Sequence, residues 1–174
     1  MFRHRPSTIR VAAWIAPVWN EDLDLDITLR SGRPYDLDLT LVADPEAEET
    51  SWSYHTVAPE TLAAPPQAMW TTDVQQISLA DASAPFIASA TFSATRQGRF
   101  NALTTWFTAG FGNDITLTNA PTAPATHWGQ YLFPLKEPVT IHQGLTIGVE
   151  FACIPAGPGY CSFKWSVRVG DDGS

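Results

Sequence analysis

One segment of the chain gathers residues that could do chemistry. Residues 118–130 read TNAPTAPATHWGQ, so that two prolines precede Thr126, His127 and Trp128. A histidine can hold a carboxylate or transfer a proton near neutral pH, and a tryptophan can stack on a planar cation such as guanidinium. The segment therefore predicts a stiff loop that presents a proton-transfer group beside a cation-binding ring. A purely structural alternative, in which His127 and Trp128 fill the mouth of a β-barrel, stays open.

The remainder of the 174-residue chain predicts strands that would carry this loop. Turn signals such as Gln143-Gly144 recur at intervals of roughly 8–12 residues, which is typical of β-sandwiches and barrels. A turn at Glu137-Pro138 is expected to separate two of the strands. We predict a mostly β fold, an antiparallel barrel or sandwich, with no long amphipathic helix after residue 69. Strands are expected at residues 8–18, 70–78, 85–94, 100–111, 115–117, 127–135, 139–141, 145–152 and 160–169.

An acidic segment interrupts this pattern near the start of the chain. Residues 21–49 contain ten acidic and two basic side chains, so they alone carry a charge of −8. Acidic and apolar residues alternate at residues 22–29 and 35–41, which favours extended structure with every Leu and Ile on one face. A short helix would also fit there. We expect a single domain, residues 1–174, in which residues 20–66 form an inserted acidic arm and connector; a solvated flap that only aids solubility is the alternative.

Charge and hydropathy disfavour several classes of partner. Outside the acidic segment, eight acidic and eight basic residues balance. Phosphate binding requires clustered Lys and Arg, so no nucleic-acid partner is expected. No apolar run approaches the ~18–20 residues of a membrane span, so no membrane partner is expected either. The sequence contains no Gly-rich strand–turn–helix motif, no Walker lysine and no His-Glu-x-x-His motif, and we expect this chain by itself to bind no cofactor and no metal.

The two cysteines, Cys153 and Cys161, flank a Gly- and Pro-rich turn and could face each other across a hairpin. A disulfide between them would need an oxidising compartment. The apolar run at residues 11–19 contains Pro17 and leads directly into acidic residues, so we interpret it as a strand and not as an export signal. We accordingly expect a cytoplasmic protein with reduced thiols, although the sequence leaves the pairing of the cysteines open.

The segment from Thr126 to Gln130 resembles the THW loop of protein arginine methyltransferases. Residues 133–144, which follow it, are similar to the apolar strand and hairpin of that family, and residues 101–111 are similar to the family's preceding strand. The motif and its flanks occur in the family's order, which makes the resemblance more specific than three letters alone. One departure is Gly129, where the family often has lysine.

The resemblance extends over nearly the whole chain. Residues 9–18 are similar to the strand that enters the family's β-barrel, and residues 26–43 resemble its dimerisation arm, with Pro34 in place of a glycine. It implies that the chain corresponds to the C-terminal β-barrel of such an enzyme. The family's other half binds S-adenosylmethionine and supplies two glutamates that grip the substrate guanidinium, and this sequence has neither part.

The resemblance also implies roles for individual residues. His127 matches the histidine that faces the family's active site, so it would support catalysis once a partner domain completes the site. Thr126 and Trp128 match residues that shape the loop and line the arginine pocket, so they would bind substrate. Contacts with the missing domain or another subunit are expected from an exposed apolar face at Val11, Trp14, Ile15, Val18 and Trp19, and from Tyr35, Leu37 and Leu39 in the arm.

Three functions are compatible with these observations. The first is a subunit or cut domain of an arginine N-methyltransferase, which would be inactive alone and would need a separate S-adenosylmethionine-binding domain. The second is a non-catalytic binding or scaffold module derived from such an enzyme, and the third is an unrelated β-sandwich that binds a small ligand. The sequence leaves open whether the substrate is a protein arginine, free arginine or a peptide, and whether the chain forms a homo- or a hetero-oligomer.

Overall fold

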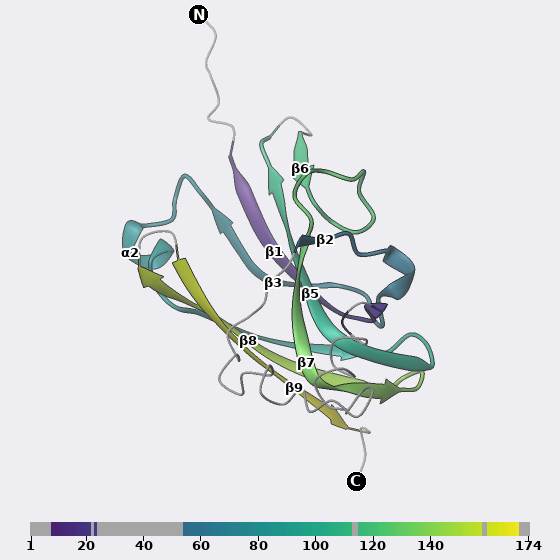
Figure 1. The fold of residues 1–174 in the computed structure, drawn as a ribbon. Coiled ribbons are helices and arrows are strands. Elements are labelled where there is room, and N and C mark those ends of the chain that lie inside the picture. The colour runs from purple at the N-terminus through teal and green to yellow at the C-terminus, as the bar shows by residue number, and fades with distance from the viewer. Residues whose placement is uncertain (1–7, 22, 24–53, 113–114, 158–159, 171–174) are drawn as a thin grey trace, which may run out of the picture.

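Two antiparallel sheets make up the computed structural model of the chain, which describes residues 8–21, 23, 54–112, 115–157 and 160–170 (Figure 1). The first sheet has the strand order β2-β7-β5-β1-β3, with β6 paired to β5, and the second has the order β4-β8-β9. The mostly β, antiparallel prediction is confirmed. No helix among the described residues is long and apolar enough to cross a membrane. The elements are β1 (Arg10–Val18), β2 (Tyr54–His55), η2 (Pro59–Thr61), β3 (Gln67–Asp73), α2 (Leu79–Ala82), β4 (Phe86–Ser93), β5 (Gly98–Gly110), β6 (Thr116–Thr118), β7 (Gln130–Ile141), β8 (Thr146–Gly157) and β9 (Tyr160–Gly170).

The strand that follows the candidate loop differs from its prediction at both ends. β7 runs without a break through Glu137 and Pro138, so the turn predicted there is wrong, and the strand begins only at Gln130. Its pairing with β5 is irregular at this point, with a shift of register between Phe100 and Ala102. Because a proline cannot donate to a sheet ladder, an irregularity of this kind lets the strand continue past Pro138.

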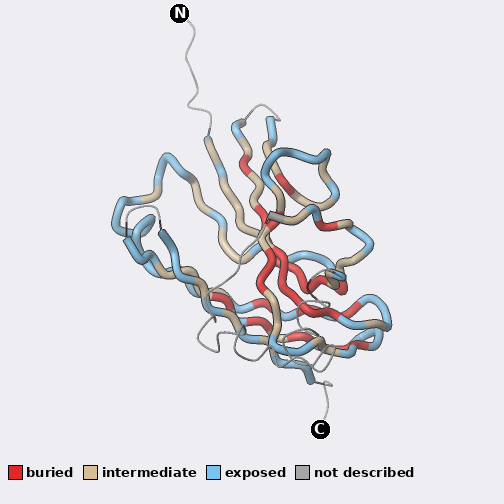
Figure 2. Tube along the Cα trace, viewed as in Figure 1, coloured by how far each residue is buried: buried red, intermediate tan, exposed pale blue. Residues whose placement is uncertain are grey.

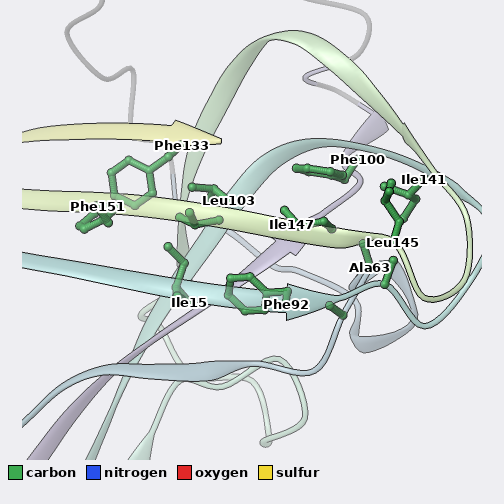
Figure 3. Close-up of a cluster of buried hydrophobic side chains, with 14 residues drawn as sticks. Ile15, Ala63, Phe92, Phe100, Leu103, Phe133, Ile141, Leu145, Ile147 and Phe151 are labelled. Carbon is green, nitrogen blue, oxygen red and sulfur yellow. The ribbon is translucent and has the colours of Figure 1, made fainter. Parts of the chain in front are cut away.

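The main hydrophobic core lies between the two sheets, where Figure 2 shows the buried segments and Figure 3 the side chains. Phe133 of β7 is the centre of an aromatic group. Its ring centroid lies 4.9 Å from that of Phe151, 5.4 Å from that of Phe163 and 5.2 Å from that of Trp165. Burial of each large side chain of this kind contributes ~1.5–3 kcal/mol. Both sheets supply the largest buried members: Ile15, Phe100, Leu103, Phe133 and Ile141 from the first, and Phe92, Ile147 and Phe151 from the second.

The first strand is more deeply buried than its sequence predicts. β1 lies between β5 and β3 in the interior of its sheet, and Ile15 and Val18 both have an exposed fraction of 0%. Ile15 packs in the main core, and Val18 packs in a second cluster on the opposite face. The prediction that Ile15 and Val18 belong to an exposed apolar face is therefore wrong, because a central strand is covered on both faces. Val11, Trp14 and Trp19 are half-buried.

The two ends of the predicted insertion lie side by side. Val18 forms a β-bridge with Leu62, and the N–H of Trp19 donates to the carbonyl oxygen of Thr61 at 3.1 Å. The residues that follow β1 therefore lie beside residues 61–62. Residues 24–53 lie outside the described part of the chain, and with them the predicted contacts Tyr35, Leu37 and Leu39.

Both cysteines carry free thiols in the β8–β9 hairpin. Cys153 opposes Phe163 and Cys161 opposes Pro155, so the two side chains are diagonal neighbours on one face of the hairpin. Burial, followed by a hydrogen bond with Cys161, raises the pKa of the Cys153 thiol to about 11. Cys153 is half-buried against the core, whereas Cys161 is exposed.

Candidate functional site

The structure brings Thr126, His127 and Trp128 together on one exposed turn that immediately precedes β7. The Oγ1 of Thr126 donates to the carbonyl oxygen of Trp128 at 2.9 Å and accepts from the N–H of Trp128 at 3.3 Å. The ring centroids of His127 and Trp128 lie 4.2 Å apart, with 43° between the ring planes. The turn thus holds an imidazole and an indole as neighbours at the surface, in the loop between β6 and β7 that bulges outward in Figure 1.

Phe107 of β5 holds Trp128 against the first sheet. The two ring centroids lie 5.8 Å apart at 68°, an edge-to-face arrangement that contributes ~0.5–1.5 kcal/mol beyond area burial. Trp128 nevertheless keeps an exposed fraction of 38%. Part of the indole therefore packs on the sheet, and part remains accessible to a planar cation.

Two buried amide side chains close the loop at its base. Asn119 and Gln130 have exposed fractions of only 3% and 6%. Asn119 Nδ2 donates to the carbonyl oxygen of Gly129 at 2.7 Å, and its Oδ1 accepts from the N–H of Phe107 at 3.0 Å. Gln130 Nε2 donates to the carbonyl oxygen of Asn119, and its Oε1 accepts from the N–H of Val57 at 2.8 Å. No local sequence pattern predicts these roles; the one signal for Gln130 is that it belongs to the segment that resembles the THW loop.

Gly129 lies where the backbone of His55 comes very close. A Cβ atom at position 129 would lie 2.7 Å from the carbonyl oxygen of His55 and 3.1 Å from its nitrogen. The approach follows from the pairing of β2 with the start of β7, in which His55 opposes Gln130. A side chain at this position would displace backbone, so the presence of glycine where lysine is common in the resembled family has a steric reason in this chain.

Trp14, one of the two tryptophans predicted to bind a partner, lies on the other face of the sheet from the residue that holds the exposed turn. Trp14 opposes Trp106 in the β1–β5 ladder, whereas Phe107, which holds the turn, points to the other face of the sheet. The Nε1 of Trp14 is buried and has no hydrogen-bond partner among the described residues. Trp19 directly follows the C-terminal end of β1. The Cζ of Arg99 lies 5.2 Å from the centroid of the Trp19 ring.

The exposed turn offers a proton-transfer group and an aromatic surface, but not a complete catalytic set. No carboxylate of the described residues forms an ion pair with His127. The same residues contain no group of three or more His, Cys, Asp or Glu side chains that could hold a metal ion. A guanidinium group is normally fixed by carboxylates that match its fork of N–H donors. The exposed turn itself supplies no such carboxylate.

Comparison with known protein families and proteins gives one consistent set of matches. The sequence pattern of the arginine methyltransferase oligomerization subdomain matches residues 10–159. The chain is 40% identical over 58 residues to the arginine N(omega)-methyltransferase of Streptomyces achromogenes subsp. streptozoticus, a match that covers 33% of this chain and 16% of the relative.

Solved structures of related fold agree with these matches. The chain superimposes on the PRMT1 enzyme–prozyme heterotetrameric complex with AdoHcy from Trypanosoma brucei with a TM-score of 0.76 and 17% identity, over 95% of this chain and 54% of that one. Protein arginine methyltransferase 10 of Arabidopsis thaliana matches with a TM-score of 0.64 and 18% identity, over 92% of this chain and 60% of that one. The chain thus spans little more than half the length of these solved chains and a smaller part of the curated relative.

Proposed function

This chain belongs to the arginine methyltransferase oligomerization subdomain family, and from that membership we propose that it forms the substrate-side wall of an arginine N-methyltransferase active site. The other wall comes from a separate S-adenosylmethionine-binding domain or subunit. The observation that carries the proposal is the exposed Thr126-His127-Trp128 turn, which is anchored by Phe107 and by two buried amides.

The described residues do not fit a methyl-donor site. They form strands joined by turns, and α2, of four residues, is too short to present the Gly-rich strand-to-helix turn that donor-binding folds use. S-adenosylmethionine, held by the partner domain, would supply the methyl group. The part left to this chain is to position the substrate, which is a large share of catalysis in a reaction that depends on the alignment of two groups.

Each residue of the exposed turn has a distinct task in this proposal. Trp128 stacks on the planar guanidinium of the substrate, since its ring is partly exposed. His127 holds a carboxylate of the partner domain, which orients that carboxylate toward the substrate. Thr126 fixes the turn through its two hydrogen bonds with Trp128. We infer an arginine guanidinium as the substrate group because the Streptomyces relative bears the name arginine N(omega)-methyltransferase.

We further propose that residues 20–66 form an arm through which the chain assembles with a second subunit. The matched family is an oligomerization subdomain, and the Trypanosoma brucei relative is a heterotetramer of enzyme and prozyme. Trp14 and Trp19, together with Tyr35, Leu37 and Leu39 of the arm, are the residues we propose for contacts with the partner domain or subunit. A homo- or a hetero-oligomer would each satisfy this proposal.

The test begins with a pull-down of the tagged chain from its native host. We expect recovery of a chain that binds S-adenosylmethionine. The copurified complex is then assayed for transfer of a radiolabelled methyl group to free arginine and to an arginine-containing peptide. His127→Ala should fold normally and reduce turnover at least ~100-fold, whereas His142→Ala, an exposed histidine in the β7–β8 turn, should not.

Each other outcome contradicts a defined part of the proposal. Unchanged turnover of the His127→Ala complex would overturn the role of His127. Tight binding of S-adenosylmethionine to the isolated chain in a calorimetric titration would overturn the division of the site between two domains. Recovery of the chain without any donor-binding partner would favour the non-catalytic binding module.

A further inference from the structure

We propose that Gln130 is a positioning residue that couples residues 55–57, within the predicted insertion, to the loop that carries His127 and Trp128. The inference concerns regulation of the turn, and its catalytic meaning rests on the proposed function. The physical coupling itself stands on contacts within this chain and can be measured without any partner.

The side chain of Gln130 joins two segments that are far apart in sequence. Its Oε1 accepts from the N–H of Val57, 73 residues earlier, at 2.8 Å, and its Nε2 donates to the carbonyl oxygen of Asn119, 11 residues earlier. Gln130 has an exposed fraction of 6%, and Val57 one of 4%. Because both bonds are buried, water cannot replace either of them. Breaking one bond would therefore leave a polar group unsatisfied, which costs ~1–3 kcal/mol.

A second contact reinforces the link beside it. The backbone of His55 lies so close to Gly129 that a Cβ atom there would come within 2.7 Å of the His55 carbonyl oxygen. Gly129 in turn accepts, at its carbonyl oxygen, the 2.7 Å hydrogen bond from Asn119 Nδ2. A displacement of residues 55–57 therefore acts on two consecutive residues, Gly129 and Gln130, that directly follow Trp128 in the chain.

The loop has little freedom to absorb such a displacement at its base. Asn119 and Gly129, its two ends, are joined by a hydrogen bond, and the Oδ1 of Asn119 also accepts a hydrogen bond from the N–H of Phe107. Phe107 is the residue whose ring holds Trp128. The base of the loop, the β5 backbone and residues 55–57 thus share one buried amide network, so that a shift in one member changes the position of Trp128.

The coupling can be read from fluorine NMR of the chain labelled with 5-fluorotryptophan, in which Trp128→Phe identifies the resonance of Trp128. Gln130→Glu keeps the acceptor for Val57 but, when ionised, cannot donate to Asn119. We expect a shifted Trp128 resonance at every pH at which this carboxyl is ionised. Below its pKa, which burial raises, the protonated carboxyl regains the donor, and the resonance should return to its wild-type position.

Gln97→Glu is the matched control, since Gln97 is exposed in the β4–β5 turn. It should leave the Trp128 resonance unchanged at every pH. A Gln130→Glu chain whose Trp128 resonance matches the wild type at every pH from mild acid to mild alkali would overturn the positioning role. So would a shift that acid does not reverse, because a merely disrupted structure would not be restored by one proton.

A double-mutant cycle tests the direction from residues 55–57 to the turn. Thr56→Gly, at an exposed position, loosens the backbone between His55 and Val57. It should shift the Trp128 resonance in the wild-type background and shift it by less than half as much in a Gln130→Met background. Equal shifts in both backgrounds, or no shift in either, would contradict the coupling. All of these measurements use the chain alone, so their failure is distinct from a failure of the methyl-transfer assay.

Discussion

The side-chain amide of Asn101 makes two hydrogen bonds with the backbone of Asn20, although 81 residues separate them. Asn101 Nδ2 donates to the carbonyl oxygen of Asn20 at 2.7 Å, and its Oδ1 accepts from the N–H of Asn20 at 2.9 Å. The side chain of Asn20 in turn accepts from the N–H of Leu23 at 3.0 Å. Asn101 has an exposed fraction of 0%, so this pair fixes the path by which the chain leaves β1.

Replacement of Asn101 should therefore destabilise the chain markedly. Asn101→Ala removes both bonds and leaves a small cavity, and we expect the free energy of unfolding to fall by about 2–3 kcal/mol. The measurement is urea denaturation followed by circular dichroism. Gln97→Ala, at an exposed position four residues earlier, should remain within about 0.5 kcal/mol of the wild type. A value for Asn101→Ala within that same range would contradict the anchoring role.

The sequence predicts the strands of the fold better than it predicts the contacts that hold the exposed turn in place. The strands predicted at residues 85–94 and 160–169 agree with β4 and β9 to within about one residue at each end. The turn predicted at Gln143-Gly144 is also present, and Gly144 has a φ of +87°, a conformation that glycine adopts readily.

What the sequence did not reveal depends on contacts between distant segments. Asn101, Asn119 and Gln130 are polar residues, and no local pattern distinguishes a buried amide from an exposed one. Pro138 predicts a strand break from its local sequence, and the prediction fails because the compensating irregularity lies in the pairing with β5. The resemblance to the THW loop located the exposed turn at Thr126, but not the network beneath it.

Gly129 offers a direct steric test of how the turn is held. Gly129→Ala would bring a Cβ atom to 2.7 Å from the backbone oxygen of His55, and overpacking of this kind costs about 1–3 kcal/mol. Gly129→Lys should cost at least as much, although lysine is common here in the resembled family, because it carries the same Cβ. Both variants should lower the thermal midpoint measured by calorimetry.

Gly170→Ala serves as the control for these variants. A Cβ at position 170 would meet no atom within 4 Å, so the midpoint should stay close to that of the wild type. If Gly129→Ala and Gly170→Ala unfold at the same temperature, the close approach of His55 does not constrain the turn.

The aromatic group around Phe133 should dominate the stability of the core. Phe133→Ala removes three ring contacts, with Phe151, Phe163 and Trp165, and large-to-small changes of this kind cost about 3–5 kcal/mol. Ile87→Ala, on a side chain that is 76% exposed, should change stability by no more than about 0.5 kcal/mol. Chemical denaturation of the two variants side by side would contradict the assignment if their losses were equal.

The half-buried thiol of Cys153, in the β8–β9 hairpin, should make the stability of the chain fall at alkaline pH. Burial, followed by the hydrogen bond with Cys161, raises the pKa of its thiol from 9.0 to about 11. Between those two pH values the folded chain keeps a proton that the unfolded chain has lost. The contribution of this thiol to stability is thus complete below pH 9 and declines as the pH rises toward about 11.

Cys153→Ser isolates this effect, because serine does not ionise in that range while Cys161 and every other titrating group are retained. The free energy of unfolding of the wild type should therefore fall more steeply between pH 9 and about 11 than that of Cys153→Ser. Urea denaturation at several pH values in this window, under reducing conditions, gives both slopes. Parallel curves would mean that the Cys153 thiol ionises equally readily in the folded and unfolded chains, and that its packing against the core does not hold the proton.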